Sequence, residues 1–108
     1  YMYFPIEEQK STQVSEGLTR TFLAEGGKLM SVRARFEKGY QLEPHSHPEE
    51  QVSFIIKGKL RCSIAGEVKV LEEGDSLYVP SDVQHSMLAL EEAVIIDVFT
   101  PQRQDLLT

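Results

Sequence analysis

Residues 39–58 read GYQLEPHSHPEEQVSFIIKG, from Gly39 to Gly58, and include two of the three histidines of the chain. His45 and His47 are two positions apart, so on an extended strand their side chains lie on one face. Neutral imidazole is the commonest metal ligand among protein side chains. The spacing and the flanking glycines and prolines favour a metal site over two unrelated surface histidines.

A second segment, punctuated in the same way, holds the remaining histidine. Residues 74–85 read GDSLYVPSDVQH and end at His85. The two segments together resemble the two signature motifs of the cupin family, G-x5-H-x-H-x3,4-E-x6-G and G-x5-P-x-G-x2-H-x3-N. The positions that match at the expected spacing are Gly39, His45, His47, Gly58, Gly74, Pro80 and His85.

The chain departs from these motifs at three positions. Gln51 replaces the usual glutamate, Asp82 the second-motif glycine, and Ala89 the closing asparagine. A glutamine offers a carbonyl oxygen as a ligand but brings no negative charge. One divalent ion (Mn, Fe, Ni or Zn) would keep its full charge available to an anionic ligand. The metal ligands that the resemblance implies are His45, His47, Gln51 and His85.

Neighbouring glutamates leave one alternative open for the fourth ligand. The pairs Glu49-Glu50 and Glu72-Glu73 are typical of solvated charges at turns. A strand register shifted by one residue would nevertheless turn Glu50 inward in place of Gln51.

The pattern along the chain predicts an all-β fold. Short apolar-alternating segments separated by glycine are typical of a sandwich or closed barrel. The cupin resemblance, over about residues 30–100, implies a double-stranded β-helix (a jelly roll) with an internal ligand cavity. The expected strands span residues 18–24, 30–36, 52–56, 60–64, 68–71, 76–79, 85–90 and 94–100.

Composition narrows the class of protein. Residues 1–108 are expected to form a single cupin domain. A net charge of −6 argues against a nucleic-acid surface, and no apolar run reaches membrane-spanning length. The N-terminus lacks the pattern of a signal peptide, and the single Cys62 excludes an internal disulfide. We therefore expect a cytoplasmic protein with Cys62 as a core thiol.

A second group of polar residues lies near the C-terminus. Asp97 and Phe99 share one face of an apolar strand, and Arg103 follows after a Thr100-Pro101 bend. An inward carboxylate needs a partner or a function, because burying an unpaired charge is costly. Two interpretations stay open: an Asp97–Arg103 salt bridge that clasps the C-terminal segment, or a pair of ligand-binding groups.

The spacing D-x-F-x3-R, with the metal motif and its glutamine, resembles the pectin-degradation cupins that linearise 4,5-unsaturated uronates. This resemblance implies an enzyme in which Asp97 transfers a proton, Arg103 binds the carboxylate of a small sugar acid and Phe99 walls the pocket. It also implies a homodimer. The alternatives are a metal-dependent dioxygenase and a non-catalytic sugar-acid-binding module.

Overall fold

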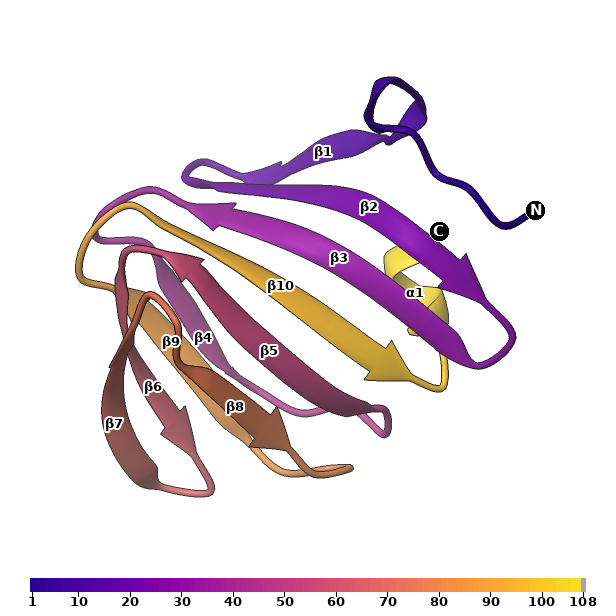
Figure 1. Ribbon diagram of the computed structural model, residues 1–108. Helices are drawn as coiled ribbons and strands as arrows, with labels where there is room; N and C mark the ends of the chain where they lie inside the picture. The colour runs from indigo at the N-terminus through magenta and orange to yellow at the C-terminus, as the bar shows by residue number, and fades with distance from the viewer. Residues whose placement is uncertain (108) are drawn as a thin grey trace.

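The structure is a computed structural model that describes residues 1–107 and consists almost entirely of β-strands in two antiparallel sheets (Figure 1). Glycine-bounded, alternating segments form these strands because each can bury one face and expose the other. The elements are η1 (Ile6–Glu8), β1 (Ser11–Ser15), β2 (Leu18–Gly26), β3 (Leu29–Phe36), β4 (Gln41–His45), β5 (Glu50–Lys57), β6 (Lys59–Ile64), β7 (Glu67–Glu72), β8 (Ser76–Val79), β9 (His85–Ala89), β10 (Ala93–Thr100) and α1 (Gln104–Leu107).

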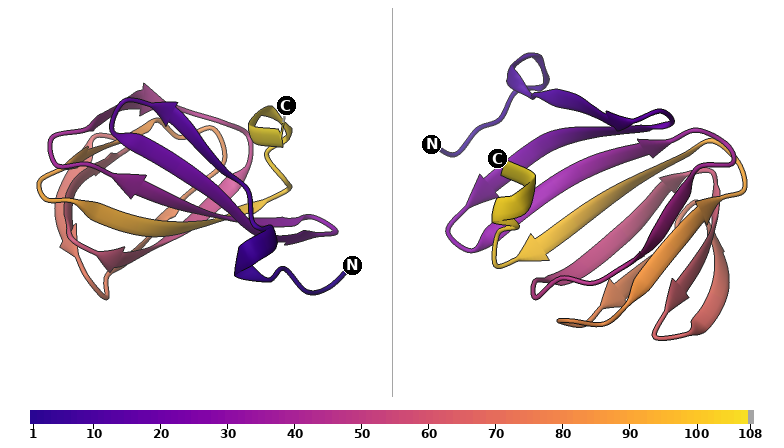
Figure 2. Two further views of the ribbon diagram at one scale, coloured as in Figure 1. Left: turned by 90° about the horizontal axis from the view of Figure 1, so that it is seen from above. Right: turned by 180° about the vertical axis from the view of Figure 1, so that it is seen from behind.

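The strand order shows the jelly-roll topology. The larger sheet runs β1-β2-β3-β10-β5-β8, and the smaller runs β4-β9-β6-β7. Neighbours in each sheet come from distant parts of the chain, as when β10 inserts between β3 and β5. The two sheets curve around a common interior, which is seen end-on in Figure 2. The predicted all-β jelly-roll architecture is confirmed.

The interior contains two apolar clusters with polar residues between them. Along β10 the inward residues are buried in alternation, and one of them, Asp97, is a carboxylate. The smaller cluster consists of Met30, Val32 and Phe99, with Leu106 of α1 packed against it. The larger cluster consists of Leu18, Ala34, Phe36, Ile55, Leu60, Cys62, Met87, Ala89, Ala93 and Ile95. The expectation that Cys62 is a core thiol is confirmed, and burial raises the pKa of its thiol to about 11.

Four elements are absent from the expected set: η1, β1, β4 and α1. β1 has no apolar alternation and lies fully exposed against β2. β4 contains Pro44 and three polar residues, a composition that does not favour a strand, and its pairing with β9 stabilises it as one. α1 is a single turn beside the larger sheet, on the inner face near the end of β10 (Figure 2). In such short or polar segments, tertiary packing decides the structure.

Two left-handed backbone positions fix the motif loops. Gly58 has a φ of 87°, and a Cβ there would collide with the carbonyl of Glu92. Asp82, at the motif position usually held by glycine, has a φ of 62°, which aspartate tolerates better than most residues. Its backbone N–H donates to the carbonyl of His47 at 2.9 Å, so the second motif loop is tied to the first.

Among residues 1–107, no helix has the length and apolar character needed to span a membrane.

Candidate metal centre

The three histidines converge from three segments at one end of the jelly roll. His45 ends β4, His85 begins β9, and the two residues are direct partners across these strands. His47 lies beyond β4, in the connection to β5. The prediction that His45 and His47 share one face of a strand is therefore wrong, and a bend in the chain brings His47 to the site instead. One ring nitrogen from each histidine lies within 4.8 Å of the others.

Backbone carbonyls fix the orientation of all three rings. The Nδ1 atoms of His45, His47 and His85 lie 2.9, 3.0 and 2.9 Å from the carbonyl oxygens of Glu43, Glu49 and Val83. A carbonyl only accepts, so each Nδ1 carries the proton and each Nε2 presents a lone pair. Metal-binding histidines are commonly held in this way by a hydrogen bond at the other ring nitrogen.

Gln51 adds an oxygen to this group of nitrogens. Its Nε2 donates to Ser53 Oγ at 2.8 Å and to Asp97 Oδ1 at 3.3 Å, which directs its Oε1 toward the histidines. Gln51 Oε1 lies 3.2 Å from His47 Nε2. With the tautomer above, both atoms are acceptors, and a cation between them is the arrangement that satisfies both.

The remaining donor atoms also fit a metal ion. His85 Nε2 is buried and has no hydrogen-bond partner among the described residues. Burial is the main cause that lowers the pKa of His85, to about 4, and it is also the main cause that lowers the pKa of His47. Both rings therefore stay neutral ligands at neutral pH. Three imidazoles and an amide oxygen suit a divalent transition metal. These four side chains are therefore the residues that would hold it.

Glu50 does not compete with Gln51 for the inward position. Gln51 is 5% exposed, whereas the Glu50 side chain lies outside and accepts a hydrogen bond from the Tyr78 hydroxyl. The alternative strand register is therefore wrong.

Asp97 lies beside the proposed ligands on the inner face of β10. Asp97 is in register with Ser53 of the adjacent strand β5, and its carboxylate accepts hydrogen bonds from Ser53 Oγ and Gln51 Nε2. Desolvation raises the pKa of this carboxyl to about 6, although the Ser53 hydrogen bond and the nearby Arg20 and Arg103 favour the charged form. This carboxyl therefore changes between its acid and its base form about one pH unit below neutrality, much closer to neutral pH than an ordinary aspartate does.

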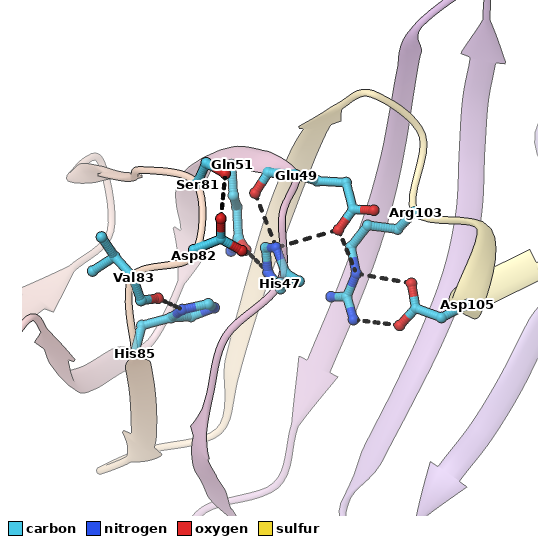
Figure 3. Close-up of polar contacts among 9 residues, drawn as sticks. All are labelled: His47, Glu49, Gln51, Ser81, Asp82, Val83, His85, Arg103 and Asp105. Atoms are coloured by element: carbon cyan, nitrogen blue, oxygen red, sulfur yellow. Dashed lines mark hydrogen bonds and ion pairs between the residues drawn. The ribbon is translucent and has the colours of Figure 1, made fainter.

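Arg103 approaches the same cavity from the chain that follows β10 (Figure 3). Its guanidinium lies over the Phe99 ring, 5.2 Å from the ring centroid, and forms an ion pair with Asp105 at 2.7 Å. Its Nε lies 4.0 Å from Glu49 Oε1. Of the two interpretations left open for this pair, the Asp97–Arg103 salt bridge is wrong: among the described residues Arg103 pairs with Asp105 and lies near Glu49, because the bend after β10 directs it there.

The expectation that Glu49 is a solvated turn charge is also wrong. Its side chain is 13% exposed and lies between two site residues, with Oε1 at 3.6 Å from His47 Nδ1 and at 4.0 Å from Arg103 (Figure 3). The segment between β4 and β5 folds over the site, and no hydropathy pattern signals such a loop. The pair Glu72-Glu73 is exposed, as expected.

A cavity of about 420 Å³ extends inward from these residues, a size typical of small-molecule sites. It brings three of the proposed metal ligands, His45, Gln51 and His85, together with Asp97, Phe99 and Arg103. His47 reaches the same site through its contacts with Gln51 and Phe99.

The cavity also contains Arg20 and Tyr40, which the sequence patterns do not single out. The signal for Arg20 was present, because it alternates in phase with Leu18 and Phe22 on the inward face of β2.

The fold and the paired histidine loops define a class of protein. The chain belongs to the cupin family, since the cupin domain matches residues 32–99. Among curated relatives, the chain is 32% identical to the pectin degradation protein KdgF of Dickeya dadantii, over 97% of both proteins.

Two solved structures share the whole fold with this chain. An RmlC-like cupin from Shewanella frigidimarina superposes with a TM-score of 0.91 and 33% identity, covering 96% of this chain and 94% of that one. KdgF from a Halomonas species superposes with a TM-score of 0.91 and 30% identity, covering 98% of both chains.

Proposed function

We propose that the protein is a metal-dependent enzyme that promotes ring opening and ketonisation of 4,5-unsaturated monouronates, the sugar acids released when pectin or alginate is cleaved by lyases. The observation that carries the proposal is the position of Asp97. A buried carboxyl with a raised pKa lies within hydrogen-bond distance of a proposed metal ligand, in a cavity that also contains two arginines. The full-length similarity to a pectin degradation protein supports the substrate class.

The reaction is an isomerisation that needs proton transfer and no redox partner. Opening at the anomeric carbon breaks the ring C–O bond, forms an aldehyde from the hemiacetal hydroxyl, and leaves an enol at C4–C5. The enol then loses its hydroxyl proton and gains one at C4, which yields a linear 5-keto acid. Protons gained and lost balance, so a single acid–base residue can serve both transfers.

Asp97 has the properties that this role requires. Its pKa of about 6 allows it to give up and take back a proton near neutral pH. Ser53 and Gln51 hold the carboxylate in place through hydrogen bonds, so its position does not depend on the substrate. A bound divalent ion would polarise a substrate oxygen and stabilise developing negative charge.

Arg103 and Phe99 would position the sugar acid. A guanidinium binds a carboxylate in bidentate fashion, and an overall acidic protein needs a local cation to attract an anion. The Arg103–Asp105 ion pair lies partly at the surface, with the Asp105 side chain 60% exposed, so a substrate carboxylate can compete for the same guanidinium. Phe99 is buried at the cavity wall and excludes water from that side.

The proposal also includes the identity of the metal, the class of substrate, the cellular location and the oligomeric state. The ion is one of Mn, Fe, Ni or Zn, since each accepts imidazole and amide ligands. The protein acts on a small anionic sugar acid, in the cytoplasm and as a homodimer.

An activity assay tests the proposal directly. Purified protein is mixed with a freshly prepared unsaturated monouronate, and loss of the C4–C5 double bond is followed by ultraviolet absorbance while NMR identifies the product. We expect linear keto acid to form well above the uncatalysed rate, with no oxygen consumed, and chelator treatment to abolish the excess. Oxygen uptake coupled to product formation would favour a dioxygenase. Tight binding of the uronate without turnover would favour a sugar-acid-binding module.

A further inference from the structure

Arg20 is a cavity residue that the proposed reaction does not use. It lies on the inward face of β2 in register with Ala34 of β3, and both residues line the cavity. Because Ala34 has only a methyl group, the long Arg20 side chain has room to extend over the neighbouring strand. The side chain is half-buried.

The guanidinium of Arg20 has no ion-pair or hydrogen-bond partner among residues 1–107, and it interacts with the nearby charged groups only through longer-range electrostatics. Burial and the charge of Arg103 both lower its pKa, while Asp97 acts in the opposite direction. A half-buried guanidinium whose donors meet no protein acceptor, in a cavity that also contains Arg103, favours binding of an anion from outside the protein. Arg103 is already paired with Asp105 and lies near Glu49, whereas Arg20 has no carboxylate within ion-pair distance among residues 1–107, so Arg20 is the arginine more open to an added anion.

Strand register places Arg20 at the opposite end of the site from the metal ligands. Gln51, Phe99 and Met30 form one row across the larger sheet. Asp97 lies in the next row, and the row beyond it contains Arg20 with Ala34 and Ile95. At the usual rise of a strand, the backbones of the outer two rows are about 13 Å apart, and the long side chains of Arg20 and Arg103 shorten this span enough for their charges to interact. Asp97 therefore lies between a metal-and-Arg103 end and an Arg20 end.

We infer that Arg20 is a second anion-recognition residue and that the cavity selects small acids that carry oxygen-rich groups at both ends. In the proposed reaction, Arg103 would hold the carboxylate, and Arg20 would hold the oxygen at the opposite end of the opened chain. Asp97 would then lie beside the carbon atoms between them. The inference rests on the proposed function for which end holds the substrate carboxylate, but the binding preference itself does not require turnover.

Two six-carbon probes separate this role from a purely structural one. Adipate has a carboxylate at each end and hexanoate has one, so isothermal titration of the metal-loaded protein compares a two-ended with a one-ended acid. We expect adipate to bind at least about tenfold more tightly than hexanoate, because a charge-assisted hydrogen bond is worth about that much. Adipate that binds no more tightly than hexanoate would overturn the inference.

Arg20→Gln is the decisive variant, and Arg61→Gln is its control, since Arg61 is exposed on β6 and its loss changes the net charge equally. We expect Arg20→Gln to lose about tenfold or more in adipate affinity while hexanoate affinity changes less than about threefold. Arg61→Gln should change neither. An equal loss for both probes in Arg20→Gln would show that Arg20 only supports the fold or the charge of Asp97.

Arg20→Lys covers the case in which the glutamine variant does not fold. It keeps the charge but cannot bind a carboxylate in bidentate fashion, so we expect a smaller loss that is still confined to adipate. Unchanged adipate binding in a folded Arg20→Lys variant would contradict bidentate recognition. If the two-ended preference holds while unsaturated uronates are not turned over, the inference stands and the proposed function fails.

Discussion

The side-chain oxygen of Gln51 faces the Nε2 atom of His47 at 3.2 Å, although both atoms are hydrogen-bond acceptors. Each is fixed in this orientation from its far side. The carbonyl of Glu49 holds the proton on His47 Nδ1, and Ser53 and Asp97 accept from the Gln51 amide nitrogen. A cation at this point satisfies both acceptors, and the same amide links it to the carboxylate proposed to carry the proton.

Replacing Gln51 by glutamate separates metal binding from catalysis. The carboxylate of Gln51→Glu keeps an oxygen ligand, so we expect the metal content to remain near wild type. It removes the amide donor to Ser53 and Asp97 and places a second negative charge beside Asp97, so turnover should fall by about tenfold or more. Metal content by elemental analysis and turnover on unsaturated uronate measure the two effects. Full activity in this variant would show that the neutral amide is not needed.

Asp97→Asn tests the proton-transfer role. The amide keeps a hydrogen-bond acceptor for Ser53 but cannot transfer a proton, so we expect turnover to fall about 10²-fold or more while the metal is retained. Glu91→Gln, an exposed carboxylate removed from the cavity, is the matched control and should keep wild-type turnover. An Asp97→Asn variant with wild-type rates would assign Asp97 a structural role.

The raised pKa of Asp97 predicts how stability depends on pH in the metal-stripped protein. Between about pH 4 and pH 6 the folded state holds a proton that the unfolded state has released, so the stability contributed by this group is lost as the pH rises. The free energy of unfolding of wild type should therefore fall relative to Asp97→Asn, by on the order of 2–3 kcal/mol from pH 4 to pH 7.

Denaturant titrations of both metal-stripped proteins at several pH values measure this difference. Using the difference also cancels the opposite contribution of His85, whose lowered pKa makes stability rise with pH. A difference that stays constant across the range would show that the Asp97 carboxyl titrates as in the unfolded chain.

Gly58 and Gly66 provide a matched test of the fold. Both have positive φ values, of 87° and 82°, but a Cβ at Gly58 would collide with the Glu92 carbonyl, whereas none of the described atoms lies within 4 Å of a Cβ at Gly66. We expect Gly66→Ala to cost about 1 kcal/mol of unfolding free energy and Gly58→Ala clearly more, in the range of about 2–4 kcal/mol. Equal losses in the two variants would contradict the described packing at Gly58.

Much of this architecture is predictable because it follows from local spacing. The glycines of the two motifs mark turns, and inward residues of β3, β5 and β10 alternate with a period of two. The spacing also singles out Asp97 and Phe99, since an acidic residue in phase with apolar ones must point inward. These signals are contained within single strands.

The contacts that escape prediction involve residues distant in sequence. The sequence pattern of Glu49 is that of a solvated charge, but the connection between β4 and β5 brings its side chain close to Arg103. The partner of Arg103 depends on the bend after β10, and the relation of Arg20 to Asp97 depends on β10 lying next to β3. Pairing between distant strands is set by the whole topology, so no window along the chain contains it.

Metal content, measured by elemental analysis of the purified protein, tests the central claim most directly. We predict about one divalent transition-metal ion per chain in wild type, and none in the double variant His45→Ala with His47→Ala, whose circular dichroism should still show a folded β protein. Stoichiometric metal in the folded double variant would contradict the ligand assignment made here.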